Sequence, residues 1–237
     1  MMDNRSFNPR RRLRLDALRR SILVGVVLMG LSAFGMPAAS AATKSPGLLQ
    51  TTDLPGSFQQ SSGPIAYATP TALVVTPSAC TETTRFAAAA LGGVEIVFAR
   101  TGATPGSIAL IESVISFRSA KAAAKDFALD AKSHKARMKC GTLGFIPPGS
   151  ATVGGSTTYQ TAKFPKIGSG VYYESSGVPG TASTNTAVTF VSGPYIVRLG
   201  TFGGTNPLTV TDLKTIAPRA LKRLPIPTPI PPTTLAR

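Results

Sequence analysis

Only a few side chains in this chain could perform chemistry, and the first to consider are its two cysteines. Cys80 and Cys140 lie far apart in the sequence, so they lack the CxxC spacing that lowers a thiol pKa in redox-active pairs. A metal site is also disfavoured, because the chain has a single histidine. In an oxidising compartment this pair predicts a disulfide, which would remove denatured-state entropy worth about 4 kcal/mol.

The single imidazole limits the kinds of catalysis that are possible. A Ser-His-carboxylate triad could form only around His134, and the helical phase of this residue points it toward the core. Glu95 and Glu112 lie in predicted strands, and we expect them on solvent-facing sides rather than as a catalytic pair. We therefore predict no catalytic residue, no metal ligand and no cofactor, and interpret the chain as a non-enzyme. A secreted hydrolase is the alternative, which a pocket joining His134 to a serine and a carboxylate would indicate.

A cationic helix carries the candidate binding residues. Residues 118–139 contain no Gly or Pro and are rich in Ala, Lys and Arg, so they predict a long helix that ends at Gly141. One face should dock on a sheet through Ala120, Ala123, Ala124, Phe127, Ala131, His134 and Met138. The opposite face gathers Arg118, Lys121, Lys125, Lys132, Lys135 and Lys139. Lys121, Lys125 and Lys132, together with Arg198 from a later strand, are our candidate ligand contacts, and a merely solvated helix face is the alternative.

Alternation of apolar and polar residues predicts the strands that must position these groups. Short helices are expected at residues 45–54 and 81–91, and a hairpin turn at Gly193-Pro194. The strands are expected to be antiparallel, and the later ones to have one solvent-facing side. They are predicted at residues 65–76, 94–101, 107–117, 156–164, 170–175, 186–192 and 195–202.

A second helix is predicted at residues 211–224. Thr211 would be its N-cap, and Pro218 should kink it or divide it into two pieces. The proline-rich residues 225–237 are expected to form a disordered tail. The whole pattern predicts one α+β domain over residues 42–224, in which a twisted antiparallel sheet is packed by the two helices and crosslinked by one disulfide.

The first 41 residues have the composition of a secretory signal peptide. An arginine-rich head precedes an uncharged apolar run over residues 21–36, and Ala39-Ser40-Ala41 precedes a cleavage site at Ala42. Arg19-Arg20 also resembles a twin-arginine export signal. An uncleaved membrane anchor is the alternative to cleavage. We expect the rest of the chain to be secreted or held on the extracellular side of the cell envelope.

Residues after the leader are strongly basic. They contain 18 basic and eight acidic residues, for a net charge of +10. Outside the cell this charge favours an anionic envelope lipid, an acidic wall polymer or an acidic protein as partner, and excludes chromosomal nucleic acid by compartment. Peripheral contact with a membrane is compatible with the same charge. A positive surface that only keeps the protein soluble is the alternative.

Three segments resemble the PknH-like extracellular sensor domains of actinobacterial receptor kinases and their stand-alone exported relatives. These segments are LLQTTDLP near residue 50, VISFRSAKAAAKDF leading to a cysteine, and YIVRLGTFG followed by TDLKTIAPRALKRL. The resemblance implies a non-catalytic domain with an antiparallel sheet, helices and a central ligand-binding cleft. The chain departs from those kinase sensors in having one predicted disulfide instead of two, and no kinase domain. We thus expect an exported binding protein with an apolar cleft and a basic rim, or else a structural interaction module of the envelope.

Overall fold

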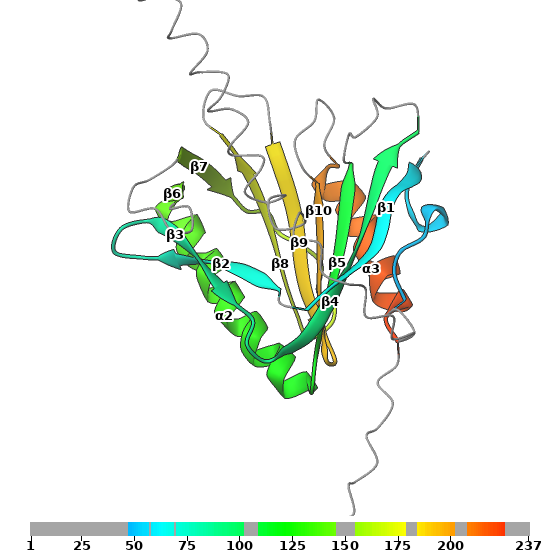
Figure 1. The fold of residues 1–237 in the computed structure, drawn as a ribbon. Helices are drawn as coiled ribbons and strands as arrows, with labels where there is room; N and C mark the ends of the chain where they lie inside the picture. Colours follow the sequence, from blue (N-terminus) through cyan, green and yellow to red (C-terminus); the bar gives the residue numbers. More distant parts are fainter. Residues whose placement is uncertain are drawn as a thin grey trace, which may run out of the picture. The chain divides into compact units, whose positions relative to one another are not determined.

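In the computed structural model, ten β-strands of the described residues form one curved sheet (Figure 1). The structure describes residues 47–56, 58–68, 70–101, 109–145, 155–178, 184–201 and 208–225. The predicted leader and all but the first residue of the predicted tail lie outside these residues. The strand order is β1-β4-β5-β10-β9-β8-β7-β6-β3-β2. The bounds are β1 (Phe58–Tyr67), β2 (Thr71–Thr76), β3 (Thr81–Phe86), β4 (Ala90–Arg100), β5 (Leu110–Phe117), β6 (Thr142–Phe145), β7 (Gly155–Gln160), β8 (Gly170–Gly177), β9 (Thr184–Ser192) and β10 (Tyr195–Thr201).

The α+β class is confirmed, but the sheet is mixed. All neighbouring strands are antiparallel except β3 and β6, which pair in parallel through Thr81 and Glu82. The helices are α2 (Ala120–Cys140) and α3 (Val210–Arg223), with one short 3-10 turn, η1 (Thr51–Asp53). Within the described residues no helix is both long and apolar enough to cross a membrane.

The two helices cover opposite faces of the central strands β8, β9 and β10 (Figure 1). Helix α3 and η1 lie on the face that carries the larger apolar core. Helix α2 lies on the other face, where the β2–β3 edge of the sheet also contacts it. Consequently β9 is buried on both sides along most of its length, so our expectation of a solvent-facing side is wrong for this strand.

Helix α3 forms as its amphipathic pattern predicts. Leu213, Ile216, Ala217 and Ala220 are all fully buried against the sheet. The N-cap is Thr209, two residues earlier than we predicted, because its side chain and that of Asp212 form a reciprocal capping box. The helix continues through Pro218 without division.

Helix α2 begins after Ser119, whose hydroxyl accepts the Ala122 N–H, and ends at Gly141 with a φ of 72°. The helix begins two residues after the predicted start and ends one residue after the predicted end, and its buried face is not the predicted alanine stripe. Ala120 and Ala124 are exposed. The buried residues are Ala123, Phe127, Ser133, His134 and Arg137. The buried face is rotated about the helix axis relative to the prediction, because the β2–β3 edge packs against the helix in addition to the central strands.

The predicted disulfide is present. Cys80 and Cys140 are bonded, with their Cα atoms 5.8 Å apart. The bond joins the turn between β2 and β3 to the last residue of α2. The disulfide therefore links the β2–β3 edge of the sheet to the C-terminal end of α2.

Two of the short elements differ from prediction. Residues 81–91 form β3 and the start of β4 rather than a helix, because Thr81, Thr83 and Thr84 suit the ladder with β2 better than the following alanines favour a helix. Residues 47–50 are irregular and only Thr51–Asp53 makes a helical turn. Ser45 and Pro46, the predicted start of that helix, lie outside the described residues. Strand β6 was not predicted.

Candidate functional site

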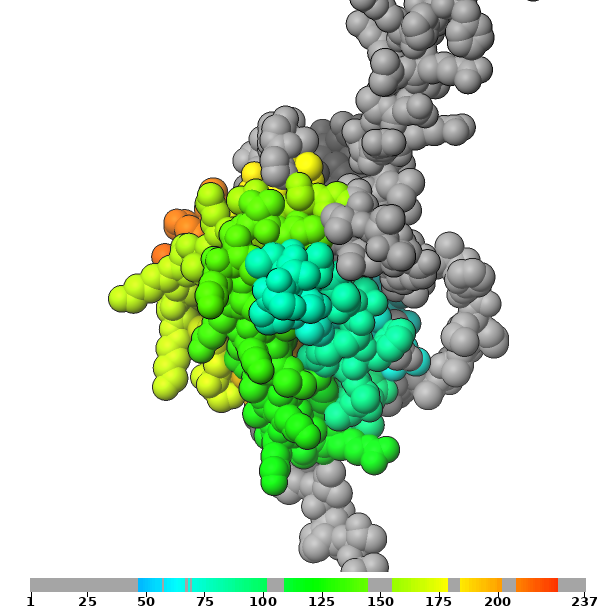
Figure 2. All heavy atoms as spheres, turned by 90° about the vertical axis from the view of Figure 1, so that its left-hand side faces the viewer, coloured from blue at the N-terminus to red at the C-terminus, as the bar shows by residue number. Residues whose placement is uncertain are grey.

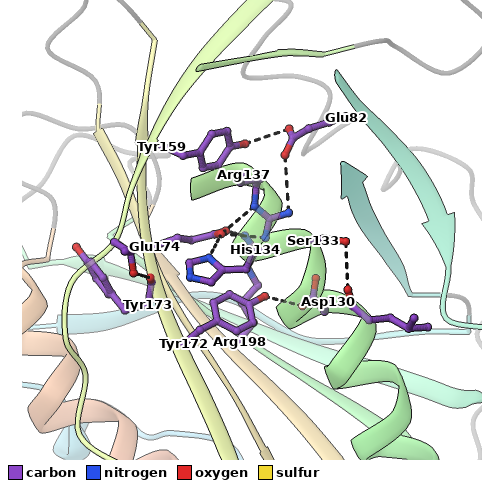
Figure 3. A network of polar contacts seen from close by, with 12 residues as sticks. Glu82, Asp130, Ser133, His134, Arg137, Tyr159, Tyr172, Tyr173, Glu174 and Arg198 are labelled. Carbon is purple, nitrogen blue, oxygen red and sulfur yellow. Dashed lines mark hydrogen bonds and ion pairs between the residues drawn. The ribbon is translucent and has the colours of Figure 1, made fainter. Parts of the chain in front are cut away.

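The carboxylate of Glu174, on β8, is the centre of a polar network between α2 and the sheet (Figure 3). The Arg137 guanidinium donates to Oε2 from Nε at 3.1 Å and from Nη2 at 2.9 Å. His134 Nδ1 lies 3.3 Å from the same oxygen, and Arg198 Nη2 lies 3.2 Å from Oε1. Since an ionised carboxylate can only accept, Nδ1 is the nitrogen of His134 that carries the hydrogen.

Glu174 is ionised although it is only 5% exposed. Burial alone would raise the pKa of its carboxyl. The His134 hydrogen bond and the charges of Arg137 and Arg198 outweigh burial and lower this pKa to about 2. Three donors from two helical residues and one strand residue thus converge on one buried carboxylate, which favours one fixed geometry.

A second carboxylate continues the network toward the β2–β3 edge. Glu82, on β3, accepts the Tyr159 hydroxyl at 3.0 Å and lies 3.8 Å from Arg137 Nη1. Burial raises the pKa of Glu82, and Arg137 only partly offsets that effect. Burial also raises the pKa of the Tyr159 phenol. Arg137 therefore bridges two carboxylates that come from opposite sides of α2.

Aromatic contacts fix the other end of the network. The rings of His134 and Tyr172 stack with centroids 4.4 Å apart. The Tyr172 hydroxyl donates to Asp130 at 2.6 Å, and its ring also meets Phe127. Burial and the nearby Asp130 charge raise the Tyr172 pKa. Together with the apolar cluster that contains Ala123 and Ile196, these contacts pack the described part of the interface in which we expected an apolar cleft.

Arg198 is where the network reaches solvent. Its side chain is 42% exposed, whereas the Glu174 side chain is 7% exposed. Its Nε is buried and has no hydrogen-bond partner among the described residues, and the same holds for the hydroxyl of Thr189, its register partner on β9. Paired residues of neighbouring strands project on the same face. Two polar atoms with unused hydrogen-bonding capacity thus lie next to each other at the edge of the network.

The network contains part of a hydrolase triad but not its nucleophile. His134 and Glu174 have the base and orienting roles available. The nearest hydroxyl in sequence, Ser133, donates to the Leu129 carbonyl at 3.2 Å within its own helix. In the part of the chain that the structure describes, no serine, threonine or cysteine is hydrogen-bonded to the His134 ring, and no group of three or more metal-ligating residues occurs.

The four predicted ligand residues do not come together. Lys121, Lys125 and Lys132 are exposed on the outer side of α2, whereas Arg198 lies between the helix and the sheet. The residues predicted from the sequence did not include Glu174 or Arg137. The spacing of Arg137 three residues after His134 was the available signal, because it places both on one side of the helix.

Carboxylates and lysines are separated in this protein. All eight acidic residues after the predicted leader make internal contacts, whereas none of the described lysines takes part in an ion pair. The acceptors are Asp53, Glu82, Glu95, Glu112, Asp126, Asp130, Glu174 and Asp212. The outer side of α2 carries the exposed cations Arg118, Lys121, Lys125, Lys132, Lys135 and Lys139, which we call the α2 cationic face. Figure 2 shows α2 in green at the surface, beside the β2–β3 hairpin in cyan.

Two carboxylates differ from our prediction of solvent-facing positions. Glu112 is fully buried on the α3 face, and its Oε2 accepts the Leu49 N–H at 2.7 Å. Burial raises its pKa to about 7. Glu95 is half-buried and accepts the Ser113 hydroxyl at 3.0 Å. Glu112 packs inward because its face of β5 also carries Leu110 and Val114, which belong to the larger apolar core under α3.

A second polar surface lies beside η1. A shallow hollow of about 420 Å³ is lined by Thr52, Asp53, Arg219, Lys222 and Arg223. Arg223 already binds both oxygens of Asp53, at 3.0 and 3.1 Å. Hydrogen bonds and the charge of Arg223 outweigh burial and lower the Asp53 pKa. Because this internal pairing uses the positive charge of Arg223, the α2 cationic face is the stronger candidate for binding an anion.

Comparison with known proteins assigns no family. No family model matches the chain, and no curated protein matches it. Among solved structures, the chain is similar to the extracellular domain of PknH from Mycobacterium tuberculosis. The sequence identity is 12% and the TM-score 0.45, and the match covers 74% of this chain and 93% of that chain. The relationship is a distant one of fold.

Proposed function

We propose that this chain is a non-catalytic binding protein on the extracellular side of the cell envelope, where its α2 cationic face attaches to an anionic envelope component. The separation of charge carries this proposal. The carboxylates are engaged in internal contacts and none of the described lysines is ion-paired, so the positive potential over α2 remains available to a polyanion.

Two features support the extracellular location. The Cys80–Cys140 disulfide belongs to an oxidising compartment. The arginine-rich leader followed by Ala39-Ser40-Ala41 has the order of a secretory signal. Together they favour envelope lipids or wall polymers as the available anions.

The Glu174 network supports a scaffolding role rather than a catalytic one. Three donors occupy its carboxylate, and the His134 ring is stacked on Tyr172. An imidazole held in this way, with no hydroxyl or thiol of the described residues hydrogen-bonded to it, suits a role in positioning α2 on the sheet. The helix is therefore presented as a rigid ridge of lysines, and Arg198 adds a partly exposed guanidinium on the inner side.

Cosedimentation at low and high salt tests the proposal. The variant with Lys121→Gln, Lys125→Gln and Lys132→Gln should lose at least about tenfold in affinity for vesicles of phosphatidylglycerol and phosphatidylcholine, or for soluble poly-glutamate. The matched control carries Lys163→Gln, Lys214→Gln and Lys222→Gln, which remove the same charge from exposed positions outside α2. Equal binding by the two variants would show that net charge, not the α2 cationic face, attracts the anion.

A further inference from the structure

Two large apolar side chains protrude from one end of the molecule. Phe86, the last residue of β3, is 63% exposed, and Leu91, the second residue of β4, is 59% exposed. The residues between them are four alanines, of which Ala88 and Ala89 are also exposed. Ala87 is buried in the apolar cluster beneath α2, so it anchors this segment, which we call the apolar tip (residues 86–91).

The apolar tip lies next to the start of the α2 cationic face. Ala90 pairs with Phe117, directly before Arg118, and Ala87 shares its cluster with Ala123 of the first helical turn. Figure 1 shows the β3–β4 connection beside the beginning of α2, at the bottom of the view. Lys121 and Lys125 are exposed on these first turns.

No free carboxylate opposes these cations among the described residues at this end. Asp126 is the one acidic side chain in the first two turns of α2, and it pairs with Arg85 at 2.7 Å. The tip therefore combines exposed apolar groups with uncompensated positive charge. This is the composition of a segment that enters the interfacial zone of an anionic bilayer.

We propose that the anionic component is a lipid bilayer, an inference that rests on the proposed function. Phe86 and Leu91 insert among the lipid headgroups. The cations beside them contact lipid phosphates, and these are Arg118, Lys121 and Lys125. A soluble polyanion would leave the two apolar side chains in water. A specific protein partner would need polar side chains on the tip to set its orientation. The residues between Phe86 and Leu91 are all alanines, which offer no such groups. Insertion into lipid requires no such pairing.

The chain contains no tryptophan, so single-tryptophan variants report on insertion. Phe86→Trp and Leu91→Trp should give blue-shifted fluorescence with vesicles of equal parts phosphatidylcholine and phosphatidylglycerol, and brominated acyl chains should quench it. Thr211→Trp, at an exposed position on α3, is the control and should show neither effect. Absence of quenching at both tip positions in vesicles that bind the protein would overturn the insertion.

A serine variant separates this inference from the proposed function. Phe86→Ser with Leu91→Ser should bind anionic vesicles at least about tenfold more weakly but bind poly-glutamate as before. The three-lysine variant should lose both ligands. If the serine variant retains full vesicle binding, lipid insertion is refuted while attachment through the cationic face survives. If the lysine variant retains poly-glutamate binding, the proposed function itself fails. Because both apolar residues are exposed, an unchanged melting temperature checks that the serine variant folds.

Discussion

Glu174 and Glu112 are buried on opposite faces of the sheet, and their two carboxyls behave in opposite ways. Glu174, on the α2 face, has two guanidinium groups and an imidazole as partners, and its pKa is lowered to about 2. Glu112, on the α3 face, accepts a hydrogen bond from the Leu49 amide, and its pKa is raised to about 7. One Glu112 oxygen has no partner among the described residues.

This difference shows that partners rather than depth decide the charge of a buried carboxyl. Glu112 shares a cross-strand row with Leu199 and Ile96, within the larger apolar core. Glu174 instead faces the polar side of α2. The α3 face thus holds the protein together by apolar burial, whereas the α2 face is fixed by charge and by the disulfide.

Removing Arg137 should have the largest effect, because it would make Glu174 resemble Glu112. Arg137→Ala leaves two buried carboxylates, Glu174 and Glu82, without their shared cation. We expect a loss of about 3–5 kcal/mol in the free energy of unfolding at neutral pH, measured by urea denaturation. Arg198→Ala is the control and should cost clearly less, since water reaches that side chain. Equal losses would mean that burial of the cation is unimportant.

Glu112 should make the protein less stable as the pH rises. Its pKa of about 7 in the folded state lies above the ordinary glutamate value of 4.5, so the folded state binds the extra proton between these values. The contribution of this carboxyl to the free energy of unfolding is about 3 kcal/mol. It is complete below pH 4.5 and is lost as the pH rises to about 7.

The variant Glu112→Gln should remove this part of the pH dependence. Urea denaturation near pH 5 and pH 8 measures it by comparison with the unchanged protein. Glu95→Gln is the control, because Glu95 is half-buried on the opposite face. A slope in Glu112→Gln equal to that of the unchanged protein would contradict the assignment. Glu174 has the opposite effect on stability, because its pKa is lowered in the folded state. Its contribution to the free energy of unfolding is lost only as the pH falls from 4.5 toward 2.

Two threonines of β9 give the smallest and most closely matched comparison. Thr186, on the α3 face, donates to the Leu208 carbonyl at 3.0 Å and contacts the Thr201 hydroxyl at 2.7 Å. Thr186→Val should therefore cost about 1–3 kcal/mol in unfolding free energy. The Thr189 hydroxyl, on the α2 face, is buried and has no hydrogen-bond partner in the part of the chain that the structure describes. Thr189→Val should cost close to nothing, and a loss equal to that of Thr186→Val would reveal a hidden hydrogen bond.

Sequence predicted the α3 face better than the α2 face. Leu213, Ile216 and Ala220 repeat at helical spacing, and apolar burial follows such a pattern directly. The Cys80–Cys140 pair was also predictable, because there are no other cysteines to compete. These features depend on residue type and spacing within one segment.

The α2 network was not predictable, because its members meet only through the tertiary fold. Glu174 and Glu82 reach Arg137 from strands β8 and β3, which are not neighbours in the sheet. The strand at Thr81–Phe86 was mistaken for a helix since its pairing with β2 and β6 outweighs local propensity. Both errors come from long-range contacts, which leave no periodic signal in the sequence.

The internal pairing of the carboxylates has a consequence for crowding. When two copies of this protein approach each other, their exposed lysines come close together. None of the described acidic residues is exposed, so no surface carboxylate compensates these charges. Such neighbours repel over roughly a Debye length, about 8 Å at physiological ionic strength. On an anionic surface we therefore expect the molecules to disperse into an even, single-layer coat instead of gathering in clusters.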